Sequence, residues 1–206
     1  SGNVYVAGTC CNPWGTPVAP YAGSFEACAA KLNTDGVRQW NTFLGSTNID
    51  HGYGIDLDGN GGVYVTGDSY DSWGAPLNPH GGPHYDVFGA RLNGSDGARQ
   101  WNTFLGFSTT SFGYDVAADR FGNVYVVGFA KYVGYGVYSD AFLPGLDSDG
   151  SRQWDVFIGK TSGYDYGYAV VPDASGHVYV AGLSDSAWFT PINDHSGLQP
   201  PLLVQF

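Results

Sequence analysis

A short motif returns four times along this 206-residue chain, and this repetition restricts the fold more than any other feature of the sequence. The first copy reads Gly-Asn-Val-Tyr-Val-Ala-Gly at residues 2–8, and close variants occupy residues 61–67, 122–128 and 176–182. The first valines of consecutive copies are 59, 61 and 54 positions apart. A period in this range indicates a repeat architecture, in which each copy belongs to one structural unit.

Three further elements recur with the same period. Each is short, rich in β-branched and aromatic residues, and bounded by Gly, Asn, Asp or Ser, which is typical of strands joined by tight turns. The elements lie at residues 26–32, 86–92, 140–146 and 200–206, at residues 38–45, 99–106 and 152–159, and at residues 52–58, 113–119 and 167–173. The repeat unit is therefore predicted to contain four short antiparallel strands.

A four-stranded antiparallel unit with this period is typical of a β-propeller blade. We predict an all-β fold, a β-propeller of about four blades, in a single domain that comprises residues 1–206. The repeat units cover approximately residues 2–51, 52–112, 113–166 and 167–206. Strand counting gives three, four, four and three strands, so the terminal blades are expected to be incomplete.

The composition agrees with this fold and excludes several partners. Of the 19 acidic residues one is a glutamate, Glu26, so turn-forming aspartate dominates and long exposed helices are excluded. The net charge of −11 disfavours nucleic acid and anionic membrane surfaces as partners. No apolar stretch approaches the roughly 18 residues that a spanning helix needs, so membrane insertion is not expected.

The repeated motifs also carry a family resemblance. The Val-Tyr-Val element, Lys-Leu-Asn at residues 31–33, Trp-Asn-Thr-Phe-Leu-Gly at residues 101–106 and Asp-Ala-Phe at residues 140–142 resemble the SBBP family. This repeat is named for seven-bladed β-propellers and is found in exported and surface proteins of bacteria and archaea. The resemblance implies a propeller and brings no catalytic motif with it.

Long insertions separate the first and second recurring elements, and they share an aromatic chemistry. Trp-Gly-x-Pro or a close variant occurs at residues 14–17, 73–76 and 188–191. Such loops can fold back over the ends of the blades, form a protein contact, or stack on sugar rings. The candidate interaction residues are Trp14, Trp73, Trp188, Tyr70, Tyr132 and Tyr135.

Three cysteines match neither a zinc site nor a haem site, so a disulfide is the simplest use for two of them. Cys28 occupies the position of Phe88 and Phe142, and Cys10 shares the parity of the preceding valines on the neighbouring strand. We predict a Cys10–Cys28 bridge, with Cys11 as a free thiol or an intermolecular link. The chain contains no Met, so its N-terminus is expected to result from processing or truncation, with export as the favoured cause. Together with a disulfide, this favours an extracellular or cell-surface location.

No metal, cofactor or catalytic site is expected. His80 and His84 have a helical spacing, but the prolines and glycines around them forbid a helix. The sequence Asp-x-Asp-Gly-Asn-Gly at residues 56–61 resembles a calcium loop without the distal glutamate, so a hairpin turn is the better interpretation. The repeated aspartates occupy equivalent turn positions, which indicates structure and not catalysis.

The threefold Arg-Gln-Trp triplet is interpreted as scaffold. We expect its arginine to pair with the preceding turn aspartate, and its tryptophan to pack between blades. The aspartates in question are Asp35, Asp96 and Asp149.

We therefore predict a non-catalytic structural and interaction module that associates into a homo-oligomer or polymer. The first and last strands of the repeat array are apolar and uncharged, and each is expected to have an unpaired edge. Unpaired strand edges promote pairing with another chain. The alternative is a carbohydrate-binding propeller whose aromatic loops hold a glycan.

Overall fold

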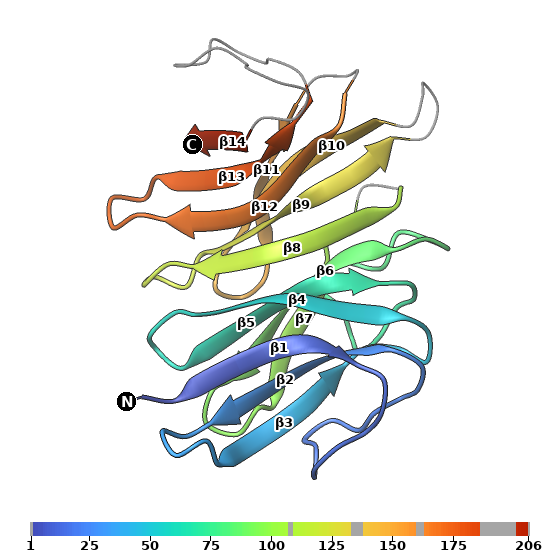
Figure 1. Ribbon diagram of the computed structural model, residues 1–206, viewed down its shortest axis with the longest axis vertical. Helices are drawn as coiled ribbons and strands as arrows, with labels where there is room; N and C mark the ends of the chain where they lie inside the picture. The colour runs from blue at the N-terminus through green and yellow to red at the C-terminus, as the bar shows by residue number, and fades with distance from the viewer. Residues whose placement is uncertain (1, 107–108, 133–137, 160–162, 186–200, 206) are drawn as a thin grey trace.

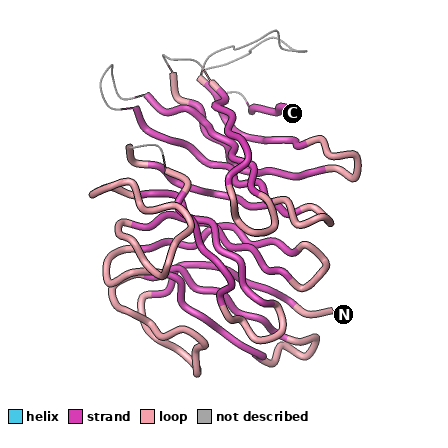
Figure 2. Tube along the Cα trace, turned by 180° about the vertical axis from the view of Figure 1, so that it is seen from behind, coloured by secondary structure: helices cyan, strands magenta, loops and turns pink. Residues whose placement is uncertain are grey.

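The computed structural model describes residues 2–106, 109–132, 138–159, 163–185 and 201–205. Strands and loops account for these residues, and Figure 2 shows no helix among them. The first two sheets contain β1 (Val4–Cys10), β2 (Glu26–Leu32), β3 (Arg38–Leu44), β4 (Asp50–Leu57), β5 (Gly62–Ser69), β6 (Asp86–Asn93) and β7 (Arg99–Phe104). The other two contain β8 (Ser111–Ala118), β9 (Val124–Tyr132), β10 (Tyr138–Leu146), β11 (Arg152–Ile158), β12 (Asp165–Pro172), β13 (Val178–Ser184) and β14 (Pro201–Gln205).

Each sheet is an antiparallel meander of consecutive strands. The orders are β1-β2-β3, β4-β5-β6-β7, β8-β9-β10-β11 and β12-β13-β14. The all-β class and the expected three, four, four and three strands are confirmed. The inner strands β4, β8 and β12 each begin two residues before the unit boundary that the sequence suggests.

The four sheets stack on one another from the N-terminal end to the C-terminal end, and their inner strands lie side by side toward the viewer in Figure 1. The strand that contains Val-Tyr-Val packs against the first strand of the next sheet, in the pairs β1 with β4, β5 with β8 and β9 with β12. The described residues form an open stack of four sheets, and no closed propeller ring is found among them.

The Val-Tyr-Val element shows how the sequence specifies this stacking. Successive side chains of a strand point to opposite faces, so a strand between two sheets needs apolar residues at every position. Val63 and Val65 are fully buried against the first sheet, with Trp40 and Leu44 in the same cluster. Tyr64, between the two valines, is buried in the cluster on the opposite face, against the third sheet.

The hairpin turn between β4 and β5 forms as the Asp-x-x-Gly spacing predicts. Asp58 accepts backbone hydrogen bonds from Asn60 and Gly62 at 2.7 and 2.9 Å. Gly59 and Gly61 have φ values of 76° and 99°, which favour glycine. Because the Asp58 carboxylate is used inside the turn, the hairpin interpretation of the calcium-like sequence holds.

No helix in the described residues is long and apolar enough to cross a membrane.

Candidate functional site

The structure separates the aromatic residues that the sequence groups together. Trp14 and Tyr70 are partly exposed, at 38% and 40%. Trp73 is buried, at 7%, and its ring contacts Phe88 and Phe104 in the core. Its place in an exposed interaction rim is therefore wrong. Trp188 and Tyr135 lie outside the described residues, and so does the side chain of Tyr132.

The first two long insertions fold back along the outer strand of their own sheet. Val18 and Leu77 donate backbone hydrogen bonds to the carbonyls of Asn41 and Asn102, at 2.8 and 2.9 Å. The side chains of these asparagines donate in turn to the carbonyls of the loop tryptophans, Trp14 and Trp73. Of the three interpretations of these loops, the structure shows folding back, and it places the loops over the outer strand edges.

The Arg-Gln-Trp arginines behave differently from the expectation. The guanidinium groups of Arg38 and Arg99 lie over the rings of Trp14 and Trp73, at 5.6 and 5.5 Å. The expected pairing of Arg38 and Arg99 with Asp35 and Asp96 is therefore wrong, because the folded-back loops supply an aromatic partner. In the third sheet, Arg152 forms its ion pair with Asp155, three residues along the same strand.

Trp40 and Trp101 of the triplet lie between sheets, as predicted, whereas Trp154 is 39% exposed. The indole nitrogen of Trp40 donates to the carbonyl of Gly94 at 3.2 Å. That of Trp101 donates to Ser148 at 3.1 Å, in the equivalent turn of the next sheet. These bonds join the outer strand of one sheet to the turn of its neighbour.

The structure contains the predicted disulfide between Cys10 and Cys28, with a Cα–Cα distance of 6.1 Å. Cys28 pairs directly with Gly8 across β1 and β2, so Cys10 is its diagonal neighbour on the same face. Cys11 is an exposed free cysteine.

The histidines of the second insertion take part in local contacts. His80 contacts the Ser69 carbonyl through Nε2 at 3.0 Å, and its ring lies 4.9 Å from that of Phe104. Among the described residues, no group of three or more His, Cys, Asp or Glu side chains is placed to hold a metal.

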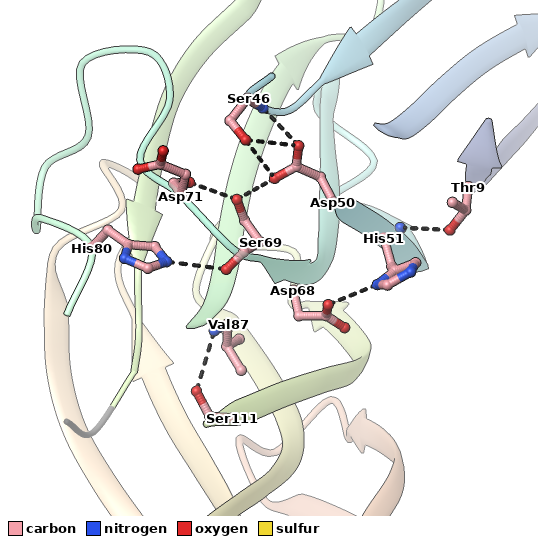
Figure 3. A network of polar contacts seen from close by, with 11 residues as sticks. Thr9, Ser46, Asp50, His51, Asp68, Ser69, Asp71, His80, Val87 and Ser111 are labelled. Carbon is pink, nitrogen blue, oxygen red and sulfur yellow. Dashed lines mark hydrogen bonds and ion pairs between the residues drawn. The ribbon is translucent and has the colours of Figure 1, made fainter. Parts of the chain in front are cut away.

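A network of buried acids lies at the loop end of the inner strands (Figure 3). Asp50, at the start of β4, is fully buried and accepts hydrogen bonds from the backbone of Ser46 at 2.7 Å and from the hydroxyl of Ser69. Asp68, also fully buried, contacts Nδ1 of His51 at 2.8 Å. The sheet packing thus removes these carboxylates from water and compensates them with local donors.

Burial raises the pKa values of several of these acids. Burial, and next the charge of Asp50, raises the pKa of Glu26 to about 7, although a backbone hydrogen bond from Ala22 opposes the shift. Burial raises the pKa of Asp68 to about 6 against the opposing effect of His51. In the third sheet, burial and the charge of Asp165 raise the pKa of Asp140 to about 6. Carboxyl pairs at two junctions between sheets therefore change charge near neutral pH.

Three tyrosines form a row across the inner strands. Tyr53, Tyr114 and Tyr168 occupy the same position of β4, β8 and β12. Their neighbouring ring centroids are 5.7 and 5.5 Å apart, with interplanar angles of 72° and 40°. Tyr53 and Tyr168 are 45% and 50% exposed, although their strands pack against neighbouring sheets. We call these three residues the tyrosine row.

A groove runs along the same three strands beside the tyrosine row. Its volume is about 430 Å³, and its walls come from residues 55–57 of β4, 115–118 of β8 and 170–172 of β12. Two of the lining residues are acidic, Asp56 and Asp115, and none is basic. Each carboxylate accepts a backbone hydrogen bond from the next inner strand, at Ala118 and Val170 respectively. We call this the axial groove.

A comparison with protein families now adds to the geometry. Residues 100–128 match the model of the SBBP beta-propeller repeat. This segment is therefore similar to SBBP repeats. A comparison with curated proteins finds no match to the chain. The SBBP match begins in β7, includes the whole of β8 and ends in β9, so it crosses the junction between the second and third sheets.

The structure also shows which residues the interpretation of the sequence missed, namely the tyrosine row. Tyr114, in the middle of the row, lies inside the matched segment, and its equivalents stand one position after a glycine in β4 and β12. The repetition of this Gly-Tyr pair was a usable signal, but repetition alone indicated scaffold. The repetition did not show that one side of the inner strands is exposed, nor that the tyrosine rings of neighbouring inner strands contact one another there.

Proposed function

We propose that this chain is a non-catalytic interaction module that acts outside the cell and binds a second copy of itself through the face of its first sheet. One observation carries the proposal. Val4 and Val6 are 50% and 48% exposed, whereas the equivalent Val63 and Val65 are fully buried. The first sheet therefore presents, to solvent, the pair of valines that the other sheets bury against a neighbour.

The internal junctions indicate the partner. At the first junction, Val63 and Val65 pack in a cluster with Trp40 and Leu44, and Tyr5 and Ala7 pack against the same cluster. At the far end of the stack, β13 presents Tyr179 and Ala181, the equivalents of Tyr5 and Ala7, and Ala181 is exposed. A second copy thus offers, at its last sheet, the kind of surface that the first sheet is shaped to meet.

Head-to-tail contact is the expected geometry, because the two faces belong to opposite ends of the stack. Among the described strands, β1 pairs with β2 only, so its other edge is open. An open strand edge favours pairing with another chain. The Cys10–Cys28 disulfide supports the extracellular part of the proposal, because disulfides persist in oxidising compartments.

Sugar binding by the loops is the weaker candidate. Trp14 and Tyr70 keep enough exposure to stack on a sugar ring, but the burial of Trp73 interrupts the aromatic rim that such a site would use.

Light scattering coupled to size-exclusion chromatography tests self-association. We expect the native chain to elute with a mass of two or more copies of 21.9 kDa at micromolar concentration. Val6→Asp places a charge on the proposed contact and should return the mass to one copy. Val37→Asp, at an exposed turn position, is the matched control and should leave the mass unchanged. A native chain that is monomeric throughout this range would contradict the proposal.

A further inference from the structure

The glycine of the Val-Tyr-Val-x-Gly element marks the place where an inner strand meets its own sheet. In the second, third and fourth sheets, a Cβ atom on this glycine would overlap the carbonyl oxygen of an inner-strand residue. Only glycine lets the inner strand approach so closely. The glycines are Gly67, Gly128 and Gly182, and the carbonyls belong to His51, Phe112 and Tyr166.

Gly8 stands at the same position of the first sheet, but its surroundings differ. Apart from its chain neighbours, no heavy atom lies within 4 Å of the place where its Cβ atom would be. The rest of β1 lies against β4 as its equivalents do at the other junctions, and a Cβ atom on Gly52 would lie 2.7 Å from the Gly8 carbonyl. The first sheet thus has the glycine that admits an inner strand, and the described residues place no strand there.

The neighbouring strand β4 is uncovered on the same side. Tyr53 and Leu57 are 45% and 41% exposed, whereas Tyr114 of β8, which has an inner strand on either side, is half-buried. An inner strand beside β1 would cover β4 as β4 covers β8.

Carboxylates connect neighbouring inner strands, and β4 lacks this connection on its uncovered side. Asp115 of β8 accepts a hydrogen bond from the backbone of Val170 in β12 at 2.9 Å. The amide at the equivalent position of β4 belongs to Ile55, and no carboxylate of the described residues accepts from it. An aspartate directly after the tyrosine of an incoming strand would supply this acceptor.

We propose that the inner edge of β1 binds an extended strand of another chain by β-strand addition, and that this strand contains an aromatic residue, glycine, tyrosine and aspartate in this order. β8 shows the pattern, as Phe-Gly-Tyr-Asp at residues 112–115. The carbonyl of the aromatic residue lies over Gly8, the tyrosine packs on Tyr53, and the carboxylate accepts from the Ile55 amide. The strand comes from another chain because every inner strand of the described residues is already paired within its own sheet.

A synthetic peptide with the sequence of residues 111–118, Ser-Phe-Gly-Tyr-Asp-Val-Ala-Ala, is the probe. We expect it to bind the full chain saturably in the millimolar range or more tightly, as measured by NMR titration. Hydrogen–deuterium exchange within Val4–Cys10 should become slower in the complex, because the added strand pairs with the open edge. A scrambled peptide of the same composition should do neither.

Gly8→Ala tests the position of the strand. Alanine fits the free chain, because the backbone φ is not in the left-handed region and the space beside Gly8 is open. The variant should fold as the native chain does by circular dichroism and should bind the peptide at least about tenfold more weakly, since its methyl group occupies the place of the incoming carbonyl. Val4→Ala, on the same strand and face, is the control and should retain binding. In the peptide, Asp115→Leu should weaken binding several-fold.

This edge is separate from the valine face that is proposed for self-association, and neither proposal requires the other. Val6→Asp should therefore return the chain to one copy and still bind the peptide, so the two proposals can fail independently. Three results would overturn the present one: no saturable binding of the peptide, equal binding of the scrambled peptide, or native affinity in Gly8→Ala.

Discussion

Glu26 illustrates at the level of one residue how the stacking of sheets sets a property of the whole chain. The residue is 1% exposed, and the pKa of its carboxyl group is raised to about 7, first by burial and then by the charge of Asp50. The folded state therefore retains a proton that the unfolded chain releases above about pH 4.5. This contribution to stability is complete below that pH and is lost as the pH rises through about 7. Asp68 and Asp140 act in the same direction.

We expect the melting temperature to be lower at pH 8 than at pH 5. Glu26→Gln stays neutral at both values, so the variant should be more stable than the native chain at pH 8, by about 1–3 kcal/mol, and the pH dependence should become smaller. Thermal unfolding followed by circular dichroism measures both. Asp35→Asn, at an exposed turn position, should show the native pH dependence. A native chain that is more stable at pH 8 would contradict this interpretation of the buried acids.

Residue roles were predictable where they depend on alternation along a strand. The Cys10–Cys28 bridge followed from parity, because the strand pairing fixes which side chains share a face. Trp73 was misplaced because its burial depends on a loop that turns back on β7, and no local pattern encodes that path. The tyrosine row was missed for a related reason, since the open side of the inner strands is a property of the assembled stack.

At the scale of elements, a pair of residues distinguishes the outer strands that a described loop covers from the outer strand β11, over which the described residues place no loop. β3 and β7 contain Asn-Thr after the tryptophan, and both are overlaid by a returning loop. β11 has Asp155 and Val156 at these positions, and its Trp154 and Phe157 are 39% and 40% exposed. The asparagine holds the loop through the tryptophan carbonyl, so the sequence difference and the structural difference correspond.

Asn102 tests this relation. Its side chain is fully buried, donates to the Trp73 carbonyl at 3.0 Å and accepts from Arg99. Asn102→Leu should lower the free energy of unfolding by about 1–3 kcal/mol, because it leaves both partners unsatisfied. Proteolysis should then become faster within residues 70–84, where the loop loses its attachment.

Asp155→Leu is the matched control, since Asp155 occupies the equivalent place in a strand to which no described loop residue is hydrogen-bonded through its backbone. Its ion pair with Arg152 is partly exposed, so the change in stability should stay below about 1 kcal/mol. Equal losses in the two variants would show that the loop attachment does not depend on Asn102.

At the scale of the whole molecule, the repeat predicted the sheets, their order and the incomplete terminal sheets, but not whether the sheets close into a ring. The period gives strand number and connectivity because each repeat folds as one meander, and short hairpin turns fix the order. Whether the stack closes into a ring depends on the angle between neighbouring sheets. This angle arises from side-chain packing in the three clusters between sheets, and no local pattern in the sequence encodes it. The open stack of Figure 1 therefore had to be seen in the structure.

An open stack has a graded stability, because each sheet is stabilised by its neighbours alone. The second and third sheets have a neighbour on both faces, and every residue of β5 is buried. β1, its equivalent in the first sheet, lacks a sheet on the Val4 face. In dilute solution, hydrogen–deuterium exchange of peptides from Val4–Cys10 should therefore be faster than that of peptides from Gly62–Ser69. Raising the protein concentration should slow exchange in β1 and leave β5 unchanged, because association covers the valine face. Equal exchange of the two strands in dilute solution would contradict the graded stack, whereas a β1 rate that ignores concentration would contradict self-association alone.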